Sequence, residues 1–412
     1  MKQYGLLGEK LSHSYSPRLH ALLADYRYEL WETPPDGLDA FMRAKDFDGL
    51  NVTIPYKRAM LPYLDEVSDT ARRVGCVNTV VKCADGTLFG DNTDVYGFEA
   101  MAARAGVDFA GQKTLVLGSG GASLTVCHAV RAAGGAPVVV SRGGETTYDD
   151  VEKHADAAFV VNASPVGMYP HTDASPLDLT RLDGLKGVLD VIYNPLRSRL
   201  MQQAEGLGLP RASGLRMLVY QAARACELFT GEPVQASRMQ EAEKALRASA
   251  TNLVLVGMPG CGKSTVGRRL AARLKLPYVD IDAEIERAAG ASVEHIFQAE
   301  GESGFRARER EQLARFGREG GRVLATGGGA VKDAINREHM RLNGVVVRLE
   351  RKLDRLATGG RPLSTGREAL QALWRERAPL YDACADVTIE NNGTLAQCVR
   401  KVEEAYYEAL CH

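Results

Sequence analysis

The sequence lacks the features of a membrane protein and of a nucleic-acid-binding protein. Its 412 residues contain no apolar run long enough to cross a membrane, and the opening MKQYGLLGEK has no charged stretch followed by a long apolar one. We therefore expect a cytoplasmic protein. The 51 Lys and Arg residues nearly balance the 52 Asp and Glu residues, and a net charge of -1 gives no electrostatic footprint for nucleic acid or an anionic membrane. We expect small-molecule partners, and the sequence gives no indication of oligomeric state.

Paired cysteines and repeats are also missing. The eight cysteines never stand two residues apart, which excludes a zinc knuckle and a thioredoxin-type pair. We expect reduced, mostly buried thiols. No internal repeat or low-complexity tract is present, and the two glycine-rich loops described below differ in spacing.

Short β-rich runs alternate with alanine-rich helical stretches along almost the whole chain. This alternation indicates an α/β fold in which helices cover parallel sheets. A chain of this length favours two or three domains. One series of strands runs through the front part, and a second series begins with NLVLVG. Between them, residues 230–252 form a polar, alanine-rich segment without β signal, so we place the boundary near Ser249.

The stretch GMPGCGKSTVG, residues 257–267, contains the pattern G-x-x-x-x-G-K-S between an apolar strand and a helical run. This context indicates a phosphate loop, whose glycines let backbone amides turn towards phosphate oxygens at a helix N-terminus. We expect ATP here, with Lys263 neutralising the β and γ phosphates and the Ser264 hydroxyl ligating Mg²⁺. The residues expected to bind the nucleotide are Gly260, Cys261, Gly262, Lys263, Ser264 and Thr265.

Charged residues in the sequence after this loop could bind the molecule that accepts the phosphate. Asp280 and Asp282 in DID follow a strand at spacing two, so both carboxylates can project the same way. One could hold magnesium and the other could orient an attacking hydroxyl as a base, although such a pair is also typical of a helix N-terminal cap. Arg306 and Glu309 lie three apart on one helix face, where a surface ion pair is the ordinary interpretation.

Together with the phosphate loop, the motifs DID, FRARE, TGGGA, RPL and RAPLY resemble the shikimate kinase family over residues 251–412. The resemblance implies a five-stranded parallel sheet of the nucleoside monophosphate kinase type. It also implies that Asp282 binds and helps deprotonate the 3-hydroxyl of shikimate, and that Asp280 supports magnesium. The other implied contacts are those of Arg306, Gly328 and Arg377 with the substrate, and of Arg361 in a short lid with the transferring phosphoryl group.

The front half contains a different glycine-rich turn, LVLGSGGAS, at residues 115–123. It resembles a dinucleotide-binding turn in which Ser123 replaces the third glycine, and a plain strand-to-helix turn is the alternative. The next strand ends at Arg142, at the position where an acidic residue would bind the ribose of NAD. An arginine there suits the 2'-phosphate of NADP, and we favour this interpretation over a solvated surface arginine. The residues expected at the cofactor are Gly118, Ser119, Gly120, Gly121, Ala122, Ser141 and Arg142.

Small hydroxyl and amide side chains gather in four motifs of the first hundred residues: LSHSYSP, LNVTIPYK, CVNT and GDNTDVYGF. Such groups can hydrogen-bond a polyhydroxylated ring. Lys57 and Asp94 are the charged members placed for proton transfer, with a surface ion pair as the alternative. With NASPVGM, DVIYNP and GLRMLVYQA further along, these motifs resemble the shikimate dehydrogenase family over residues 1–247.

This second resemblance implies NADPH-dependent reduction of 3-dehydroshikimate, with Lys57 and Asp94 as the catalytic pair. Lys57, oriented by Asp94, either donates the proton or only positions the substrate. The implied substrate contacts are Ser14, Ser16, Thr53, Asn78, Tyr193 and Gln221, and Val191 and Gly214 would line the nicotinamide site. The implied domains are a substrate domain at 1–98 plus 223–247, a Rossmann NADP-binding domain at 99–222, and the P-loop kinase domain at 251–412.

Because the product of the first reaction is the acceptor of the second, the sequence predicts a bifunctional enzyme of aromatic precursor biosynthesis. Three alternatives stay open. One half could be a catalytically silent binding module, the front half could be a quinate or shikimate dehydrogenase that uses NAD, or the kinase could phosphorylate another hydroxylated molecule such as gluconate. The presence of Lys57, Asp94, Lys263 and Asp282 argues against a silent half, and Arg142 disfavours NAD.

Overall fold

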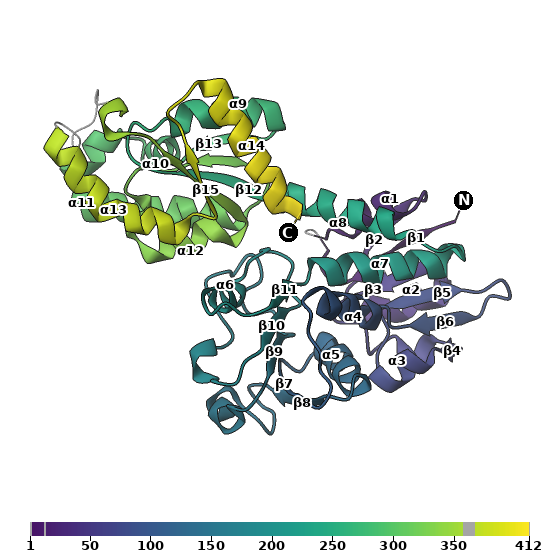
Figure 1. Ribbon diagram of the computed structural model, residues 1–412. Helices are drawn as coiled ribbons and strands as arrows, with labels where there is room; N and C mark the ends of the chain where they lie inside the picture. The colour runs from purple at the N-terminus through teal and green to yellow at the C-terminus, as the bar shows by residue number, and fades with distance from the viewer. Residues whose placement is uncertain (1, 12–13, 357–366, 412) are drawn as a thin grey trace. The chain divides into compact units, whose positions relative to one another are not determined.

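A computed structural model describes residues 2–11, 14–356 and 367–411, and its chain divides into two units (Figure 1). The first unit comprises Met1–Tyr193 and Ser198–Leu246, and the second comprises Asn194–Arg197 and Arg247–His412. The division along the chain falls inside helix α8 (Ala236–Ala250), close to the predicted boundary at Ser249.

The first sheet of the first unit has six strands in the order β2-β1-β3-β5-β6-β4. Its strands are β1 (Tyr4–Gly8), β2 (Tyr28–Glu32), β3 (Gly49–Val52), β4 (Glu66–Val67), β5 (Thr79–Lys82) and β6 (Leu88–Asp91). The alternation pattern predicted parallel sheets, but β5 runs antiparallel to β3 and β6. A short turn explains the antiparallel pairing of β5 with β6, because the Cys83 amide donates to the Thr87 carbonyl and Gly86 adopts a φ of 87°. Such a turn reverses the chain without a crossover helix.

The second sheet of the same unit has five parallel strands in the order β11-β10-β9-β7-β8, as a dinucleotide-binding fold requires. These strands are β7 (Lys113–Leu117), β8 (Ala136–Val140), β9 (Phe159–Asn162), β10 (Gly187–Asp190) and β11 (Arg211–Ser213). The α-helices of this unit, besides α8, are α1 (Ser16–Leu23), α2 (Leu38–Ala44), α3 (Asp69–Val74), α4 (Asp94–Arg104), α5 (Gly121–Ala132), α6 (Arg199–Gly206) and α7 (Leu215–Thr230). The predicted dinucleotide turn therefore joins β7 to α5.

Helices α4 and α7 run side by side in this unit (Figure 1). Gly97 of α4 makes their close approach possible, because a Cβ added there would lie 2.4 Å from the Met217 carbonyl oxygen and 3.1 Å from Cβ of Gln221. A larger residue would force the helices apart. The glycine thus holds Asp94, at the start of α4, near Gln221 of α7.

The second unit contains a five-stranded parallel sheet in the order β13-β14-β12-β15-β16, which confirms the predicted sheet. Its strands are β12 (Asn252–Val256), β13 (Tyr278–Asp280), β14 (Val323–Ala325), β15 (Gly344–Glu350) and β16 (Val387–Glu390). The α-helices are α9 (Lys263–Leu274), α10 (Ile281–Ala289), α11 (Val293–Arg318, kinked at Gly301), α12 (Ala334–Leu342), α13 (Arg367–Cys384) and α14 (Leu395–Cys411). Figure 1 shows α9 and α14 on one side of this sheet and α12 and α13 on the other.

Buried apolar strands form the cores of both units. Leu253, Val254, Leu255 and Val256 of β12 are all fully buried, which explains why this strand reads as a continuous apolar run. The prediction of mostly buried, reduced cysteines is confirmed, since all eight are free and only Cys83 and Cys411 are exposed. Within the ranges that the structure describes, no helix has the length and apolar character needed to span a membrane.

Candidate active sites

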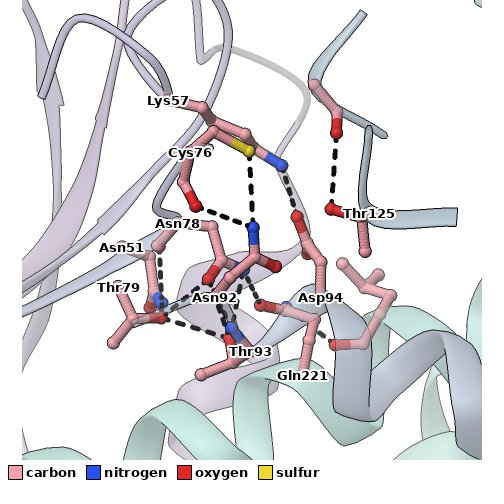
Figure 2. Close-up of polar contacts among 12 residues, drawn as sticks. Asn51, Lys57, Cys76, Asn78, Thr79, Asn92, Thr93, Asp94, Thr125 and Gln221 are labelled. Carbon is pink, nitrogen blue, oxygen red and sulfur yellow. Dashed lines mark hydrogen bonds and ion pairs between the residues drawn. The ribbon is translucent and has the colours of Figure 1, made fainter. Parts of the chain in front are cut away.

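Lys57 and Asp94 form a close ion pair in the first unit (Figure 2). Lys57 Nζ lies 2.6 Å from Asp94 Oδ2, and the two side chains are 19% and 10% exposed, which does not fit a surface pair. Burial by itself would lower the pKa of the Lys57 ammonium, but the adjacent Asp94 carboxylate outweighs burial and the pKa is raised. The lysine is therefore held in its charged, proton-bearing form.

The dinucleotide turn approaches this pair. A Cβ added to Gly121, the first residue of α5, would lie 3.4 Å from Cδ of Lys57, so the lysine side chain packs against the glycine backbone. The structure thus brings together two predicted site residues that follow strands of different sheets in the first unit, β3 and β7.

Asn78 sits at the centre of a buried hydrogen-bond network beside the ion pair (Figure 2). Its Oδ1 accepts from the Thr93 amide at 2.7 Å and from Thr79 Oγ1 at 3.2 Å. Its Nδ2 donates to Thr93 Oγ1 at 3.0 Å and to Gln221 Oε1 at 3.5 Å. The predicted contacts Asn78, Asp94 and Gln221 therefore lie together, although they come from three separate elements.

Thr79 and Thr93 are residues of this site that the sequence analysis did not single out. Both stand inside quoted motifs, directly after Asn78 in CVNT and directly before Asp94 in GDNTD. Their position next to a predicted site residue was the available signal.

The remaining predicted substrate contacts lie on loops and helix starts. The Ser16 amide donates to Ser14 Oγ at 3.2 Å at the beginning of α1. Thr53 follows β3, where its amide donates to the Leu7 carbonyl of β1. Tyr193 lies just after β10 with its ring centroid 5.4 Å from that of Tyr15, and burial raises the pKa of its phenol to about 12, so it is a neutral hydrogen-bonding group.

The predicted cofactor residues lie at the carboxyl ends of the parallel strands, where dinucleotides bind in this architecture. Gly118 needs its φ of 111°, and a Cβ there would lie 3.0 Å from the Ala163 carbonyl. Ser119 and Gly120 are exposed before α5, and Arg142 is exposed two residues after β8. Their neighbours Ala122 and Ser141 are partly buried.

Val191 and Gly214 are in direct contact. A Cβ on Gly214 would lie 2.0 Å from the Val191 carbonyl oxygen, so only glycine fits at this position. The two residues predicted to line the nicotinamide site are thus adjacent in space, as that prediction requires.

The phosphate loop of the second unit curls between β12 and α9. Gly257, Gly260 and Gly262 all have positive φ, at 142°, 81° and 104°, which explains why glycine recurs in the loop. Lys263 Nζ donates to the Gly257 carbonyl at 2.8 Å and to the Met258 carbonyl at 3.1 Å. The lysine thus lies inside the curl, while the predicted contact Thr265 is exposed on α9.

Asn391, which the sequence analysis did not single out, supports this loop. Its Nδ2 donates to the carbonyl of Cys261 at 2.8 Å, and both residues are buried. Asn391 follows β16 and lies far from the loop in sequence, so no local pattern indicated the contact.

The two carboxylates of DID point to different places, which corrects the expectation that both project the same way. Asp280 Oδ2 accepts from Ser264 Oγ at 3.1 Å, whereas Asp282 lies 2.9 Å from a Cβ built on Gly327. The physical reason is that β13 ends at Asp280 and α10 begins at Ile281, so strand alternation does not extend across the pair. The capping alternative is also wrong, because Asp280 stands at the N-cap position but its side chain makes no capping hydrogen bond.

Arg306 and Glu309 form a partly buried ion pair rather than a surface one. Arg306 Nη1 lies 2.8 Å from Glu309 Oε2, and the Glu309 side chain is fully buried. Burial raises the pKa of Glu309, although the Arg306 guanidinium opposes this rise. Glu302 also contacts Arg306, at 3.1 Å.

The triple glycine 327–329 lets the backbone pass close to these side chains. A Cβ on Gly329 would lie 2.4 Å from Arg306 Nη2, and one on Gly328 would lie 2.8 Å from the Pro259 ring of the phosphate loop. The segment is therefore required for close packing. It brings Asp282, Arg306 and the phosphate loop into one site.

Helix α13 completes this site with Arg377 and Tyr381, one turn apart. Tyr381 Oη donates to the Gly328 carbonyl at 2.5 Å, and the Arg377 side chain is 6% exposed. Tyr381 was quoted in RAPLY without a role. Arg361, predicted to contact the transferring phosphoryl group, lies outside the described residues.

Comparison with known families agrees with both halves of this description. Residues 6–80 match the shikimate dehydrogenase substrate binding domain, residues 214–242 match the shikimate 5'-dehydrogenase C-terminal domain, and residues 259–407 match the shikimate kinase family.

Similar proteins cover the first part of the chain. Shikimate dehydrogenase (NADP(+)) of Clostridium perfringens strain SM101 is 34% identical over 259 residues, which are 58% of this chain and 95% of that protein. The enzyme of the same name from Geobacillus kaustophilus is 35% identical over 267 residues, covering 58% of this chain and 96% of that protein.

Solved structures show the same similarity. The shikimate 5-dehydrogenase from Thermus thermophilus in complex with NADP(H) and shikimate matches with a TM-score of 0.54 and 35% identity, over 60% of this chain and 99% of that chain. A chorismate mutase/shikimate 5-dehydrogenase fusion protein from Clostridium acetobutylicum matches with a TM-score of 0.56 and 33% identity, over 60% of this chain and 97% of that chain.

Proposed function

This chain belongs to the shikimate dehydrogenase family and carries a shikimate kinase domain after it in the sequence, and from this premise we propose how its two sites act in succession. The first reduces 3-dehydroshikimate to shikimate with NADPH, and the second phosphorylates shikimate with ATP to shikimate 3-phosphate. The observation that carries the proposal is the presence of both assembled centres in one chain. These are the Lys57–Asp94 pair beside Asn78, and the phosphate loop beside Asp282 and Arg306.

In the reduction, the substrate carbonyl must gain a hydride on carbon and a proton on oxygen. Bound NADPH supplies the hydride. Lys57 faces the carbonyl oxygen in its charged form and stabilises the developing alkoxide, and Asp94 orients the ammonium and keeps it protonated. The hydroxyl and amide groups of Ser14, Ser16, Thr53, Asn78, Tyr193 and Gln221 hold the ring and its carboxylate.

For the cofactor, we propose that the exposed amides before α5 bind the pyrophosphate and that Arg142 binds the 2'-phosphate. The N-terminus of α5 offers backbone N–H groups with a favourable dipole. Val191 and Gly214 line the nicotinamide.

In the phosphorylation, the acceptor hydroxyl must lose a proton as it attacks the γ phosphate. Asp282 is the base, and it lies beside the triple glycine, whose amides hold the ring hydroxyls. Arg306 and Arg377 bind the shikimate carboxylate, because guanidinium groups match carboxylates bidentately. Lys263 neutralises the phosphates at the centre of the curled loop.

The residues present fit a magnesium ion. Ser264 Oγ and Asp280 Oδ2 are hard oxygen donors 3.1 Å apart at the end of the phosphate loop. Magnesium takes few protein ligands and completes its coordination with phosphate and water, so this pair suffices, and the ion would neutralise phosphate charge. No cluster of three or more His, Cys, Asp or Glu side chains suited to a metal occurs in the described part of the chain.

We assign substrate binding, cofactor binding and kinase activity to three parts of the chain. Residues 1–98 with 223–247 bind the carbocyclic substrate, residues 99–222 bind NADP(H), and residues 251–412 form the kinase. A cytoplasmic location is part of the proposal, supported by eight free cysteines, which are typical of a reducing compartment.

The test supplies purified full-length protein with 3-dehydroshikimate, NADPH, ATP and Mg²⁺, and follows NADPH loss together with products by mass spectrometry. The expected product is shikimate 3-phosphate, in an amount equal to the NADPH consumed. No loss of NADPH would contradict the first activity, and shikimate that stays unphosphorylated would contradict the second. Three further assays test the alternatives. NADH in place of NADPH tests the cofactor, quinate tests the substrate of the dehydrogenase, and gluconate tests the phosphate acceptor of the kinase.

A further inference from the structure

The amide of Asn78 has a fixed direction in its network. Its Oδ1 receives the Thr93 amide, which can only donate, so Nδ2 faces the other way, towards Gln221 (Figure 2). Asn78 is 3% exposed, so a reversed amide would bury two donors against each other. This direction places Nδ2 beside Gln221, another predicted substrate contact.

Asn51 of β3 holds the Asn78 backbone and the Thr79 side chain in place by hydrogen bonds. Its Nδ2 donates to the Asn78 carbonyl at 3.4 Å and to Thr79 Oγ1 at 3.1 Å. Thr79 Oγ1 accepts this bond and lies 3.2 Å from Asn78 Oδ1, to which it donates, and 3.1 Å from Thr93 Oγ1. Asn51 and Thr79 are 5% and 0% exposed, so water does not satisfy them instead.

The chain of hydrogen bonds begins at Tyr28 on β2. Tyr28 Oη donates to Asn51 Oδ1 at 2.7 Å. The strands β2 and β3 both pair with β1, where Tyr4 is aligned with Tyr28 on one side and with Gly49 on the other. Gly49 has no side chain, and the Phe229 ring packs over it, since a Cβ built on Gly49 would lie 2.5 Å from Cδ1 of Phe229.

The ring of Tyr28 is itself held in place. It stacks on His20 of α1 with ring centroids 3.8 Å apart and an interplanar angle of 10°. Burial lowers the pKa of His20 to about 3, against a hydrogen bond with Asn51 that raises it, so the stacked ring is neutral in ordinary buffers.

We propose that Tyr28 is a positioning residue for the dehydrogenase substrate, acting through Asn51 and Thr79 on the amide of Asn78. This inference rests on the proposed function, since it requires that Asn78 contacts 3-dehydroshikimate or shikimate. Tyr28 is not one of the residues proposed to contact substrate or cofactor. Its hydroxyl donates to the buried Oδ1 of Asn51, and without that bond Asn51 holds Thr79 and Asn78 less firmly in place.

The test compares Tyr28→Phe with Tyr4→Phe in the full-length protein. Tyr4 is the matched control, because it is a neighbouring tyrosine whose hydroxyl donates to a buried backbone carbonyl, that of Phe229, at 2.9 Å and takes no part in the Asn51 chain. Tyr28→Phe is expected to raise the KM for 3-dehydroshikimate about 5- to 30-fold, with the KM for NADPH and the kinase activity unchanged. Tyr4→Phe is expected to lower thermal stability while the KM for 3-dehydroshikimate stays within about twofold of wild type.

A second variant pair tests the same chain if Tyr28→Phe folds poorly. Thr79→Val removes the hydroxyl that donates to Asn78 and is expected to raise the same KM, whereas Thr79→Ser keeps the hydroxyl and is expected to restore it. Equal KM values in wild type, Tyr28→Phe and Thr79→Val would overturn the inference while leaving the dehydrogenase assignment intact. A wild-type protein that does not reduce 3-dehydroshikimate would overturn both.

Discussion

At the scale of single residues, the chemistry of Lys57 depends on two opposing effects. Burial disfavours the charged ammonium, and the Asp94 carboxylate 2.6 Å away favours it by more. A general acid must carry its proton when the alkoxide develops. The proposed role of Lys57 as a general acid therefore depends on the Asp94 carboxylate.

Replacing Asp94 by Asn should move the alkaline limb of the dehydrogenase pH profile to lower pH. The raised pKa keeps Lys57 charged beyond the ordinary lysine value of about 10.4, so the wild-type reduction rate falls only above it. Without the carboxylate, burial alone acts and lowers this pKa, so the charged form is lost earlier as pH rises. The measurement is kcat/KM for 3-dehydroshikimate reduction against pH, with the kinase activity as control. An unchanged limb would show that Lys57 does not need its charge.

Replacing Arg142 by Gln should reduce the preference for NADPH over NADH. Hydrogen bonds to a charged group contribute about 1.5–3 kcal/mol, which corresponds to a loss of roughly 10- to 150-fold in the ratio of kcat/KM values. Arg131→Gln is the matched control, because Arg131 is equally exposed but lies in the last turn of α5, at the end opposite the glycine turn. Equal ratios in the two variants would place the 2'-phosphate elsewhere.

At the scale of elements, two glycines and one tyrosine determine how closely neighbouring elements pack at the two sites. Gly97 lets α4 lie against α7, and Gly328 lies between Pro259 and Tyr381. These contacts align whole elements, so changing them should displace several site residues together.

Replacing Gly97 by Ala should destabilise the dehydrogenase. The new methyl group meets the Met217 backbone, which has little room to move, and such overpacking costs about 1–3 kcal/mol. Gly206→Ala is the control, because a Cβ there meets nothing within 4 Å. Thermal inactivation of each activity is the measurement, with dehydrogenase inactivation expected at lower temperature only in Gly97→Ala. Equal inactivation temperatures in both variants would contradict the close crossing of α4 and α7.

Replacing Tyr381 by Phe should weaken shikimate binding by the kinase. The variant leaves the Gly328 carbonyl without its donor, at a cost of about 1–3 kcal/mol, so the KM for shikimate should rise about tenfold while the KM for ATP changes less. Tyr406→Phe removes an equally buried hydroxyl that donates to the Thr251 carbonyl at 3.1 Å, and it should leave both KM values unchanged. If both variants raise the KM for shikimate alike, the effect of Tyr381 is one of general stability.

At the scale of the whole molecule, two sets of proposed catalytic groups share one chain. Each set draws its residues from a single unit, Lys57 and Asp94 from the first and Lys263 and Asp282 from the second. The two activities should therefore be separable by single substitutions.

Lys57→Met should lower dehydrogenase activity by at least about 100-fold and keep kinase activity on added shikimate, whereas Lys263→Met should do the reverse. A mixture of the two variants should still convert 3-dehydroshikimate to shikimate 3-phosphate, because released shikimate diffuses between molecules. Mass spectrometry of the products checks this. A mixture that yields no shikimate 3-phosphate, although each variant keeps its remaining activity, would contradict exchange through solution.

Local sequence was enough to identify the fold class and both glycine-rich loops. The loops at Gly118 and Gly257 each follow an apolar strand and open a helix, and such strand, turn and helix signals involve residues close together in the chain. The five-stranded sheet of the second unit was predicted from the resemblance of its motifs to the shikimate kinase family. In contrast, the antiparallel β5 was missed because alternation along the sequence does not report strand direction.

The contacts that make the sites depended on folding in three dimensions. Lys57 meets Gly121, Asp282 meets Gly327, Tyr381 meets Gly328, and Tyr28 meets Asn51, each pair coming from separate elements. Periodicity and turn chemistry describe neighbours along the chain, whereas these distances follow from strand order and helix packing. Asp280 and Asp282 show the same limit, because a helix that begins between them gives two carboxylates at spacing two different partners.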